Sequence, residues 1–446
     1  MIFREYLRIL ENQGKLVRVT TPISKEYEIP AVLKKIEPTP ALFENVKDSP
    51  FQVVGNLFCG KDSFASFFNI PVSDIIPTML KAIELPAACQ VVDSAPCQQV
   101  VIREPNLNIL PILRHFPGDG GAYITSGVVV ARHPRYGLNA DFHRLMQFSS
   151  TEMSIRIVRS RHFDSFLQDM GEMDIAIAIG NPPNVLAAAA TSVDIGINEL
   201  EIASALQPLQ VVRAKTVDVF VPADSEFVLE GRVYLNRRHA EGPFVDLTET
   251  QDIIRQEPVF KLKAITHQRD AIWQALLPGG LEHKLLMGMP REPTIFRKVN
   301  QVVECLDVNV TPGGCSWLHV IVQIKKRAED DGIKAIYAAF EGHRSCKHVF
   351  VVDDDIDIYD PFAVEWAMAT RFQGDRGLVI REKEAGSSLD PSAEPGTKLT
   401  TKIGFDLTKP SSAKGKDYEK VVFPDIALQR FMRLDNSNLL HKKEME

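Results

Sequence analysis

Two short stretches of the chain carry the residue types that proton chemistry needs. The first, residues 138–144, reads LNADFHR and ends in Arg144. The second, residues 241–246, reads EGPFVD and places Glu241 and Asp246 on either side of a Gly-Pro turn. An arginine and two carboxylates that converge on one cavity form a proton-transfer site with its own counter-charge. A surface cluster of ion pairs would use the same residues, and these two stretches alone leave both interpretations open.

Three polar residues form a candidate metal site. Asn139 lies in the first stretch, His162 follows a basic segment, and Glu199 begins an apolar helix. Their amide oxygen, imidazole and carboxylate suit a hard ion such as Mn²⁺ or Mg²⁺ better than zinc or copper. A histidine considered alone is more often a structural residue than a ligand. Glu201 is a competing carboxylate, but on a helix it would point away from Glu199, so we expect only one of them to bind.

A basic pair and a lysine complete the candidate residues. Residues 281–291 read LEHKLLMGMPR, in which His283 and Arg291 flank a segment of Leu, Met and Gly that could line a pocket. Such a pair could hold a substrate carboxylate through a fork of donors, or it could belong to a solvated loop. Lys347 precedes an apolar run, where it could meet a phosphate, although a lysine at the entrance of a strand is usually solvated.

Composition limits the class of protein. The 446 residues suggest two or three domains, and 45% hydrophobic and 24% charged residues are ordinary for a globular chain. The net charge of −7 argues against a nucleic-acid binder. No apolar run reaches the ~20 residues of a membrane span, and the charged start does not resemble a signal peptide, so we expect a cytoplasmic protein. The six cysteines form no CxxC pair, and the GxGxxG and Walker A motifs of common nucleotide folds are missing from the sequence.

Two structural regions must position most of these residues. Residues 1–104 alternate helical and strand patterns, with one amphipathic helix starting near Phe3 and another over residues 28–36, which predicts a small α/β subdomain. Residues 105–297 carry short runs rich in Val and Ile between turn residues, the pattern of a mostly antiparallel barrel or sandwich. Strand ends of such a barrel would hold catalytic residues rigidly.

The third region, residues 298–446, predicts an α/β domain. Strand and helix patterns alternate there, at 302–310, 317–324, 328–340, 348–352 and 361–370. This alternation implies parallel strand pairing. Residues 383–420 are rich in Gly, Ser, Pro and Lys and predict a loop. Residues 425–434 predict a terminal helix that could pack on a neighbouring subunit, and the expected fold class for the whole chain is α+β.

Taken together, the motifs resemble the UbiD family of reversible decarboxylases. The resemblance rests on the order of Asn139, Arg144, His162, an acidic helix start and a Glu-Gly-Pro-Phe-x-Asp segment. It extends over residues 120–410 and includes the segment GSSLDP at 386–391. It implies an N-terminal α/β subdomain, a split β-barrel that binds flavin, and a C-terminal α/β oligomerisation domain.

The resemblance also implies a prenylated flavin mononucleotide as cofactor, whose phosphate is held by Mn²⁺ (or Mg²⁺) and a nearby K⁺. By resemblance, the metal ligands are Asn139, His162 and Glu199. The cofactor contacts are Asn139, Arg144, His162 and Lys347. The catalytic set is Arg144, Glu241 and Asp246. Arg144 would orient the substrate carboxylate until CO₂ leaves, and either Asp246 or Glu241 would protonate the carbon.

The substrate remains open among three hypotheses. His283 and Arg291 resemble the pair that bacterial furan-2,5-dicarboxylate decarboxylases use for the second carboxylate, so we rank decarboxylation of this acid to 2-furoate and CO₂ first. Archaeal relatives that decarboxylate anhydromevalonate phosphate are similar in segment 277–284, and a basic pair serves a phosphate equally well. A flavin- or metal-binding assembly protein without turnover is the hypothesis from another class, and the intact Arg144 and Asp246 argue against it.

The same resemblance predicts the partners of the chain. These are a small-molecule carboxylic acid, CO₂, and a flavin prenyltransferase that supplies the cofactor. We expect a homo-oligomer, either a dimer or a hexamer, and no nucleic acid or membrane partner.

Overall fold

The computed structural model describes residues 1–412, 418, 420, 421 and 424. The terminal helix expected over 425–434 lies outside these residues. Residues Met1–Thr408 form one compact unit, and all the elements below belong to it. Among the described residues, no helix has both the length and the apolar character that crossing a bilayer requires.

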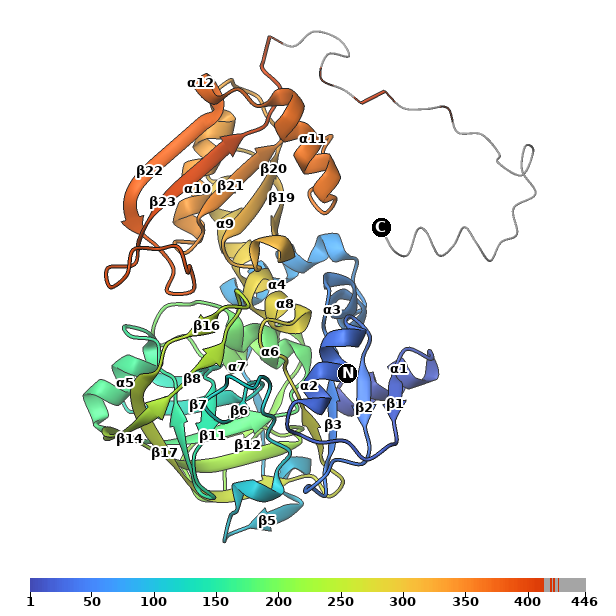
Figure 1. Cartoon of the computed structure of the whole chain (residues 1–446), viewed down its shortest axis with the longest axis vertical. Coiled ribbons are helices and arrows are strands. Elements are labelled where there is room, and N and C mark those ends of the chain that lie inside the picture. The colour runs from blue at the N-terminus through green and yellow to red at the C-terminus, as the bar shows by residue number, and fades with distance from the viewer. Residues whose placement is uncertain (413–417, 419, 422–423, 425–446) are drawn as a thin grey trace, which may run out of the picture. The chain divides into compact units, whose positions relative to one another are not determined.

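The N-terminal region contains a four-stranded sheet with helices beside it (Figure 1). In order, its strands are β1 (Val17–Val19), β2 (Ala41–Phe43), β3 (Gln52–Gly55) and β18 (Ile272–Gln274). The helices are α1 (Phe3–Asn12), α2 (Glu28–Ile36), α3 (Lys61–Phe68) and α4 (Ile75–Glu84). Helix α1 buries Phe3, Leu7 and Leu10, the face that the sequence predicts, and Gly14 follows its end at a φ of 67°.

A nine-stranded sheet, antiparallel throughout, forms the centre of the chain. Its order is β6 (Ala122–Ile124), β9 (Leu145–Gln147), β10 (Glu152–Ile155), β17 (Arg255–His267), β14 (Phe227–Glu241), β11 (Glu172–Ile179), β7 (Val128–His133) and β8 (Gly137–Phe142), with β5 (Val100–Ile102) on β17. The register shifts at Gly231, where a Cβ would lie 2.3 Å from the backbone oxygen of Lys261. The antiparallel pairing confirms the expected class of the middle region.

Smaller elements surround the central sheet. They are α5 (His162–Met170), α6 (Pro183–Ala190), α7 (Glu199–Leu206), the sheet β13 (Phe220–Pro222), β12 (Gln210–Arg213) and β4 (Gln90–Val92), and the hairpin β15 (Phe244–Val245) and β16 (Gln251–Asp252). Helices α6 and α7 are separate and are joined by a loop. Helix α7 begins after Asn198, whose Oδ1 accepts from the backbone N–H of Leu200 at 3.0 Å.

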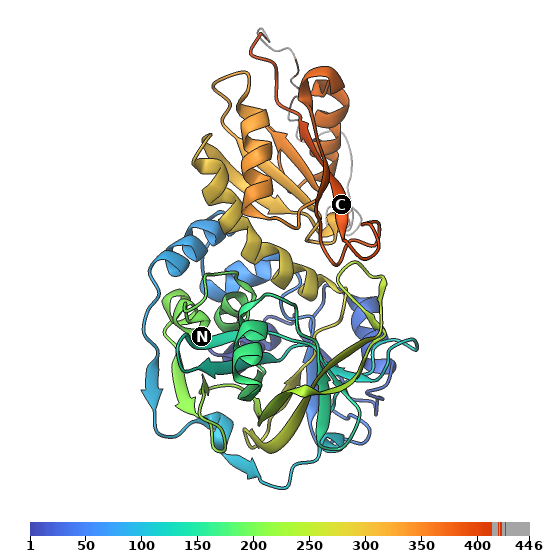
Figure 2. The ribbon, with the colours of Figure 1, turned by 90° about the vertical axis from the view of Figure 1, so that its left-hand side faces the viewer.

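The C-terminal region is a five-stranded mixed sheet with helices packed against it (Figure 2). The strand order is β19 (Cys305–Val310), β20 (His319–Ile324), β21 (His348–Val352), β23 (Leu399–Asp406) and β22 (Leu378–Ala385). The helices are α8 (Leu281–Gly288), α9 (Glu292–Asn300), α10 (Asp331–Gly342), α11 (Pro361–Arg371) and α12 (Gly374–Gly377). Strands β20, β21 and β23 pair in parallel, as the strand–helix alternation predicts.

The loop expected over residues 383–420 is wrong for residues 383–385 and 399–406, which belong to strands, whereas residues 386–398 lie outside any helix or strand. Strands β22 and β23 form an antiparallel pair that reaches into this range. The prediction followed composition, but β22 lies at the edge of the sheet, and most of its charged side chains are exposed or half-buried. An edge strand needs few apolar residues because only one side of its backbone is paired.

Shared packing ties the three regions together and fixes helix α8. Leu33 of α2, Phe43 of β2 and Phe260 of β17 belong to one hydrophobic core. The backbone N–H of Leu281 donates to Glu37 at 2.8 Å, and buried Glu282 accepts from the N–H of Leu57 at 3.2 Å. N-terminal residues therefore hold the start of α8, which carries His283.

Candidate active site

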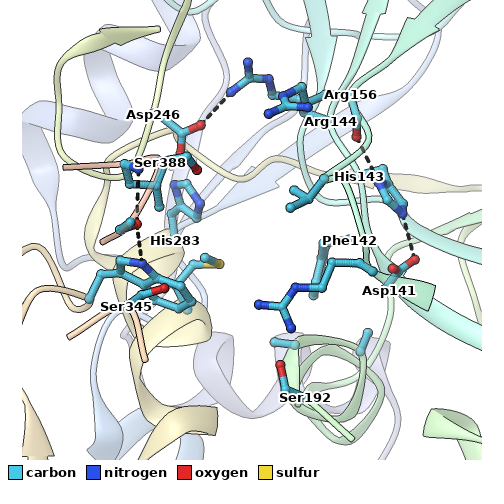
Figure 3. A pocket seen from close by; sticks show the side chains of 18 of the residues that line it. Asp141, Phe142, His143, Arg144, Arg156, Ser192, Asp246, His283, Ser345 and Ser388 are labelled. Carbon is cyan, nitrogen blue, oxygen red and sulfur yellow. Dashed lines mark hydrogen bonds and ion pairs between the residues drawn. The ribbon is translucent and has the colours of Figure 1, made fainter. Parts of the chain in front are cut away.

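Most of the predicted site residues line one cavity of about 540 Å³ (Figure 3). Those on its lining are Asn139, Arg144, His162, Glu199, Asp246, His283 and Arg291. Glu241 reaches the cavity only through its contact with Arg144. Figure 3 shows Asp246 and His283 on one wall, His143 on the opposite wall and Ser192 at the floor of the view. The cavity thus collects residues from the central sheet, α8 and the C-terminal loops.

Arg144 binds three carboxylates at once. Its Nε and one terminal nitrogen donate to the two oxygens of Glu241 at 2.8 and 3.1 Å. The terminal nitrogen that binds Glu241 also donates to Asp252 at 2.9 Å. The other terminal nitrogen donates to Asp246 at 2.5 Å. Burial lowers the pKa of Arg144, but the bonds to these carboxylates outweigh burial and raise it. The guanidinium is therefore a fixed cation between acidic groups.

The local fold explains why these groups meet. Arg144 follows the end of β8, and Glu241 is the last residue of β14. The hairpin of β15 and β16 pairs Phe244 with Asp252, and the Phe244 ring lies 4.3 Å from the Arg144 guanidinium carbon. Asp246 begins the turn of that hairpin, so a short hairpin delivers two carboxylates and a stacking ring to one arginine.

His143 supports the strand end beside Arg144. Its Nδ1 donates to the carbonyl of Arg156 at 2.9 Å, and its Nε2 lies 2.9 Å from Asp141. Burial lowers the pKa of His143, but the charge of Asp141 and these hydrogen bonds outweigh burial and raise it. Two acceptors facing both ring nitrogens favour the imidazolium form.

Two of the three expected metal ligands, His162 and Glu199, lie close enough to share an ion, and Asn139 lines the same cavity. His162 Nδ1 is 4.0 Å from Glu199 Oε1, and two ligands each about 2.1 Å from an ion lie at most about 4.2 Å apart. Asn139 is buried, and its side-chain nitrogen has no partner among the described residues. No group of three His, Cys, Asp or Glu side chains gathers as a metal site would in the described ranges, so an ion bound by His162 and Glu199 would need a further donor such as the Asn139 amide oxygen.

Glu199 is a buried carboxylate without a lysine or arginine partner among the described residues. Burial raises its pKa to about 8, against the hydrogen bond that its Oε2 accepts from the backbone N–H of Ala140 at 2.9 Å. No lysine or arginine forms an ion pair with it in the part of the chain that the structure describes. The donor set of Asn139, His162 and Glu199 therefore fits a hard divalent ion.

His283 is a neutral hydrogen-bond donor toward the cavity. Its Nδ1 accepts from the backbone N–H of Gly279 at 3.1 Å, which leaves the proton of the neutral ring on Nε2. Burial lowers its pKa, with Asp246 acting in the opposite direction. Gly279 adopts a φ of 68°, and a Cβ there would lie 2.9 Å from the Glu249 side chain.

Arg291 lines the same cavity and forms no ion pair with a carboxylate of the described residues. One terminal nitrogen donates to the carbonyl of Ala190 at 3.1 Å, the other contacts Ser192, and its Nε has no partner within the described residues. The guanidinium carbon lies 5.2 Å from the centre of the Trp317 ring. Burial and the nearby charge of Arg161 lower its pKa to about 10.

The structure does not bring Lys347 to the cavity. Its Nζ lies 2.9 Å from Asp390 and 2.5 Å from the hydroxyl of Ser392. Four residues of the segment that follows β22, residues 386–389, line the cavity instead. A contact of Lys347 with a cofactor phosphate would require it to leave Asp390, and this contact stays a prediction.

Sequence reasoning missed several charged residues of the site. They are Arg156, Arg159, Arg161, Asp252 and Arg255. Asp252 and Arg255 pair at 2.5 Å. The two residues are three positions apart and follow the EGPFVD segment, and this is the only local signal for their pairing. Nothing in that spacing shows that Asp252 would turn back onto Arg144.

The arginines that line the cavity fall into two groups, those paired with a carboxylate and those without such a pair among the described residues. Six arginines and four carboxylates line it. Arg144, Arg156 and Arg255 each pair with a carboxylate. No ion pair to Arg159, Arg161 or Arg291 occurs in the region that the structure describes. The second group of arginines can therefore receive an anionic ligand.

Three stretches of the chain match three domains of one protein family. Residues 90–281 match the 3-octaprenyl-4-hydroxybenzoate carboxy-lyase Rift-related domain. Residues 7–83 and 284–407 match the N-terminal and C-terminal domains of the same carboxy-lyase. These matches together cover most of the chain.

Individual relatives give the same result. The chain is 41% identical to an anhydromevalonate phosphate decarboxylase of Methanocaldococcus jannaschii, over 90% of this chain and 96% of that protein. The UbiD-class enzyme HmfF from Pelotomaculum thermopropionicum, solved with FMN, is 37% identical with a TM-score of 0.93, covering 97% of this chain and all of that one. An evolved dimeric form of HmfF, solved with prFMN, is 35% identical with a TM-score of 0.89 and the same coverage. The chain belongs to the UbiD family of decarboxylases.

Proposed function

We propose that this chain is a prenylated-FMN-dependent decarboxylase of an α,β-unsaturated acid that carries a phosphate, with anhydromevalonate phosphate as the best candidate. The observation that carries the proposal is that Arg291 and its neighbour Arg161, both on the cavity lining, lack carboxylate partners within the described chain. A phosphate dianion suits two guanidinium groups better than the single charge of a second carboxylate.

The substrate ranking differs from the one expected from sequence. On the sequence alone, His283 and Arg291 place furan-2,5-dicarboxylate first. The 41% identity to an anhydromevalonate phosphate decarboxylase, over 90% of this chain, favours the phosphorylated substrate. Furan-2,5-dicarboxylate stays the second candidate, because the basic pair could also hold a carboxylate.

The residues divide the work of the proposed reaction. Prenylated FMN, when bound, supplies the electron sink that decarboxylation needs. Asn139, His162 and Glu199 would hold a divalent ion for its phosphate. Arg144 orients the substrate carboxylate, and Asp246 gives a proton to the carbon that loses CO₂. Asp246 is the better donor because Glu241 is fully buried and bound through both oxygens to Arg144.

We expect Arg291→Met to impair phosphorylated substrates selectively. A charge-assisted hydrogen bond contributes ~1.5–3 kcal/mol, so its loss should lower kcat/KM for anhydromevalonate phosphate roughly ten- to a hundredfold. The measurement compares this substrate with its unphosphorylated analogue, in wild type and variant. The analogue has no anion to place near Arg291 and serves as the internal control for folding and cofactor loading. Equal losses on both substrates would mean that Arg291 supports the fold rather than the substrate.

Other expectations stay predictions. These are the identity of the metal as Mn²⁺ or Mg²⁺, a nearby K⁺, supply of the flavin by a prenyltransferase, a dimer or hexamer, and a cytoplasmic location. The domain limits at residues 104 and 297 also stay a proposal. Strands β4 and β5 precede residue 104 but pair with β12 and β17.

A further inference from the structure

Trp317 connects Arg291 to a buried serine on the lining of the cavity. The guanidinium carbon of Arg291 lies 5.2 Å from the centre of the Trp317 ring, and the indole N–H donates to Ser387 Oγ at 2.9 Å. Ser387 is 5% exposed and lines the cavity together with Arg291 and Trp317. Figure 3 shows the next residue, Ser388, on the same wall as His283. One aromatic side chain therefore contacts both a cation and a hydroxyl group of the cavity.

The hydroxyl proton of Ser387 is available to a ligand. A serine oxygen has two lone pairs and one proton. Ser387 Oγ accepts from the indole N–H of Trp317 and from the backbone N–H of Leu389 at 3.1 Å, so both lone pairs are occupied. No acceptor for the proton occurs among the residues that the structure describes. The partner that this buried hydroxyl lacks is therefore a hydrogen-bond acceptor.

The contacts of Trp317 fix its position. His343 Nε2 donates to the carbonyl of Trp317 at 2.9 Å, and the two rings meet edge to face at 4.5 Å. Burial and the charge of Arg291 lower the pKa of His343 to about 3, so this ring is neutral. Gly288 of α8 lets the preceding residue approach closely, because a Cβ there would lie 2.8 Å from the backbone oxygen of Ser316. The indole is thus in place before a ligand arrives, which lowers the cost of binding.

The charge around this hydroxyl is positive. Arg161 and Arg291 line the cavity and form no ion pair with a carboxylate of the described residues. The charge of Arg161 lowers the pKa of both Arg291 and His343, so the two arginines act on the same region. A phosphate monoester offers three acceptor oxygens, one for each of the two guanidinium groups and one for the hydroxyl. A carboxylate offers only two, so three donors fit a phosphate better.

We propose that Ser387 donates to the phosphate of the substrate and, with Arg291, forms a phosphate subsite that Trp317 aligns. The inference rests on the proposed function, because it assumes that the substrate carries a phosphate. It adds a neutral donor from the segment after β22 to the arginines of the cavity. Ser387 is then a specificity-determining residue. Trp317 is a positioning residue, because it acts through the two side chains that it contacts.

The first test measures binding of butyl phosphate to the holoenzyme by titration calorimetry. Butyl phosphate has no carboxylate to lose, so its binding is independent of turnover. Ser387→Ala should weaken this binding roughly ten- to a hundredfold, as the loss of a hydrogen bond to a charged group does. Ser387→Thr keeps the hydroxyl and should retain most of the affinity. Ser392→Ala is the matched control, because Ser392 lies in the same segment but is exposed and outside the cavity lining, and it should bind as wild type does.

The second test measures kcat/KM for CO₂ release. Ser387→Ala should lower this value roughly ten- to a hundredfold for anhydromevalonate phosphate and leave the unphosphorylated analogue nearly unchanged. Trp317→Phe keeps a ring beside Arg291 but removes the indole N–H, so it should give a smaller loss with the same selectivity. In the double variant Ser387→Ala/Arg291→Met, the total loss should be smaller than the product of the single losses, because both donors bind one group. Flavin absorbance should stay unchanged in Ser387→Ala.

Three results would overturn the subsite. They are undetectable binding of butyl phosphate to wild type, unchanged affinity in Ser387→Ala, and loss of flavin in Ser387→Ala, which would assign the hydroxyl to the cofactor. If Ser387→Ala does not fold, Ser387→Cys takes its place, because a thiol is only a weak donor, and it should show the same selective loss. Failure of the proposed function gives another pattern. Wild type would then bind butyl phosphate through Ser387 but release no CO₂ from anhydromevalonate phosphate.

Discussion

Asp246→Asn is expected to abolish turnover while the protein keeps its cofactor. An amide preserves the shape of the side chain and can still lie beside Arg144, but it cannot deliver a proton. Loss of a general acid typically lowers the rate by ~10²–10⁴-fold. The measurement is CO₂ release by holoenzyme from cells that also express a flavin prenyltransferase, with flavin absorbance recorded on the same sample.

The control for this variant is Glu249→Gln, which changes a carboxylate of the same hairpin that pairs with Lys34 and Lys284. It should keep both flavin and turnover. Near-normal CO₂ release by Asp246→Asn would remove Asp246 from the mechanism and leave Glu241 as the donor. Loss of flavin together with activity would assign Asp246 to cofactor binding instead.

Glu199→Gln is expected to remove the divalent ion and most of the flavin. Loss of a partner that only orients a ligand already costs about 10–100-fold in metal affinity, so loss of a charged ligand should cost ~100-fold or more. The fold should survive, because burial raises the pKa of Glu199 to about 8 and glutamine resembles its neutral form. The measurements are metal content by mass spectrometry, flavin absorbance and the Tm of the metal-free protein.

Glu201→Gln is the matched control for the metal site. Glu201 lies two residues further along α7 and approaches the side chain of Asn198, with an oxygen 3.3 Å from its Nδ2. This variant should retain metal and flavin. The opposite pattern, with metal lost in Glu201→Gln and kept in Glu199→Gln, would replace Glu199 by Glu201 as the ligand.

Local patterns predicted much of this fold. The periodicity of α1 and α2, and the turn residues between the strands of the central sheet, depend only on residues close together in the chain. The sequence alone therefore indicates them. The pairing of β18 with β3 depends on strands far apart in the chain, and no local pattern reveals it. Strand β22 was missed because an edge strand does not need an apolar sequence.

The site was predicted to the extent that its motifs are short and chemically distinctive. Arg144, Glu241 and Asp246 stand in such motifs, and the structure brings them together. Asp252 is missing from that set because its partner Arg144 is fixed by the hairpin register rather than by sequence spacing. Lys347 is expected at the cofactor phosphate, but in the structure it pairs with Asp390. Asp390 lies in a loop, and sequence spacing does not indicate where that loop lies.

The central claim is that the chain decarboxylates a phosphorylated unsaturated acid. The most direct measurement is kcat/KM for CO₂ release by the holoenzyme from anhydromevalonate phosphate and from furan-2,5-dicarboxylate, under identical conditions. We predict release from the phosphorylated acid with the higher kcat/KM, because its dianion meets lining arginines, Arg161 and Arg291, that form no ion pair among the described residues. A higher value for furan-2,5-dicarboxylate, or no release from either acid by flavin-loaded protein, would contradict the account.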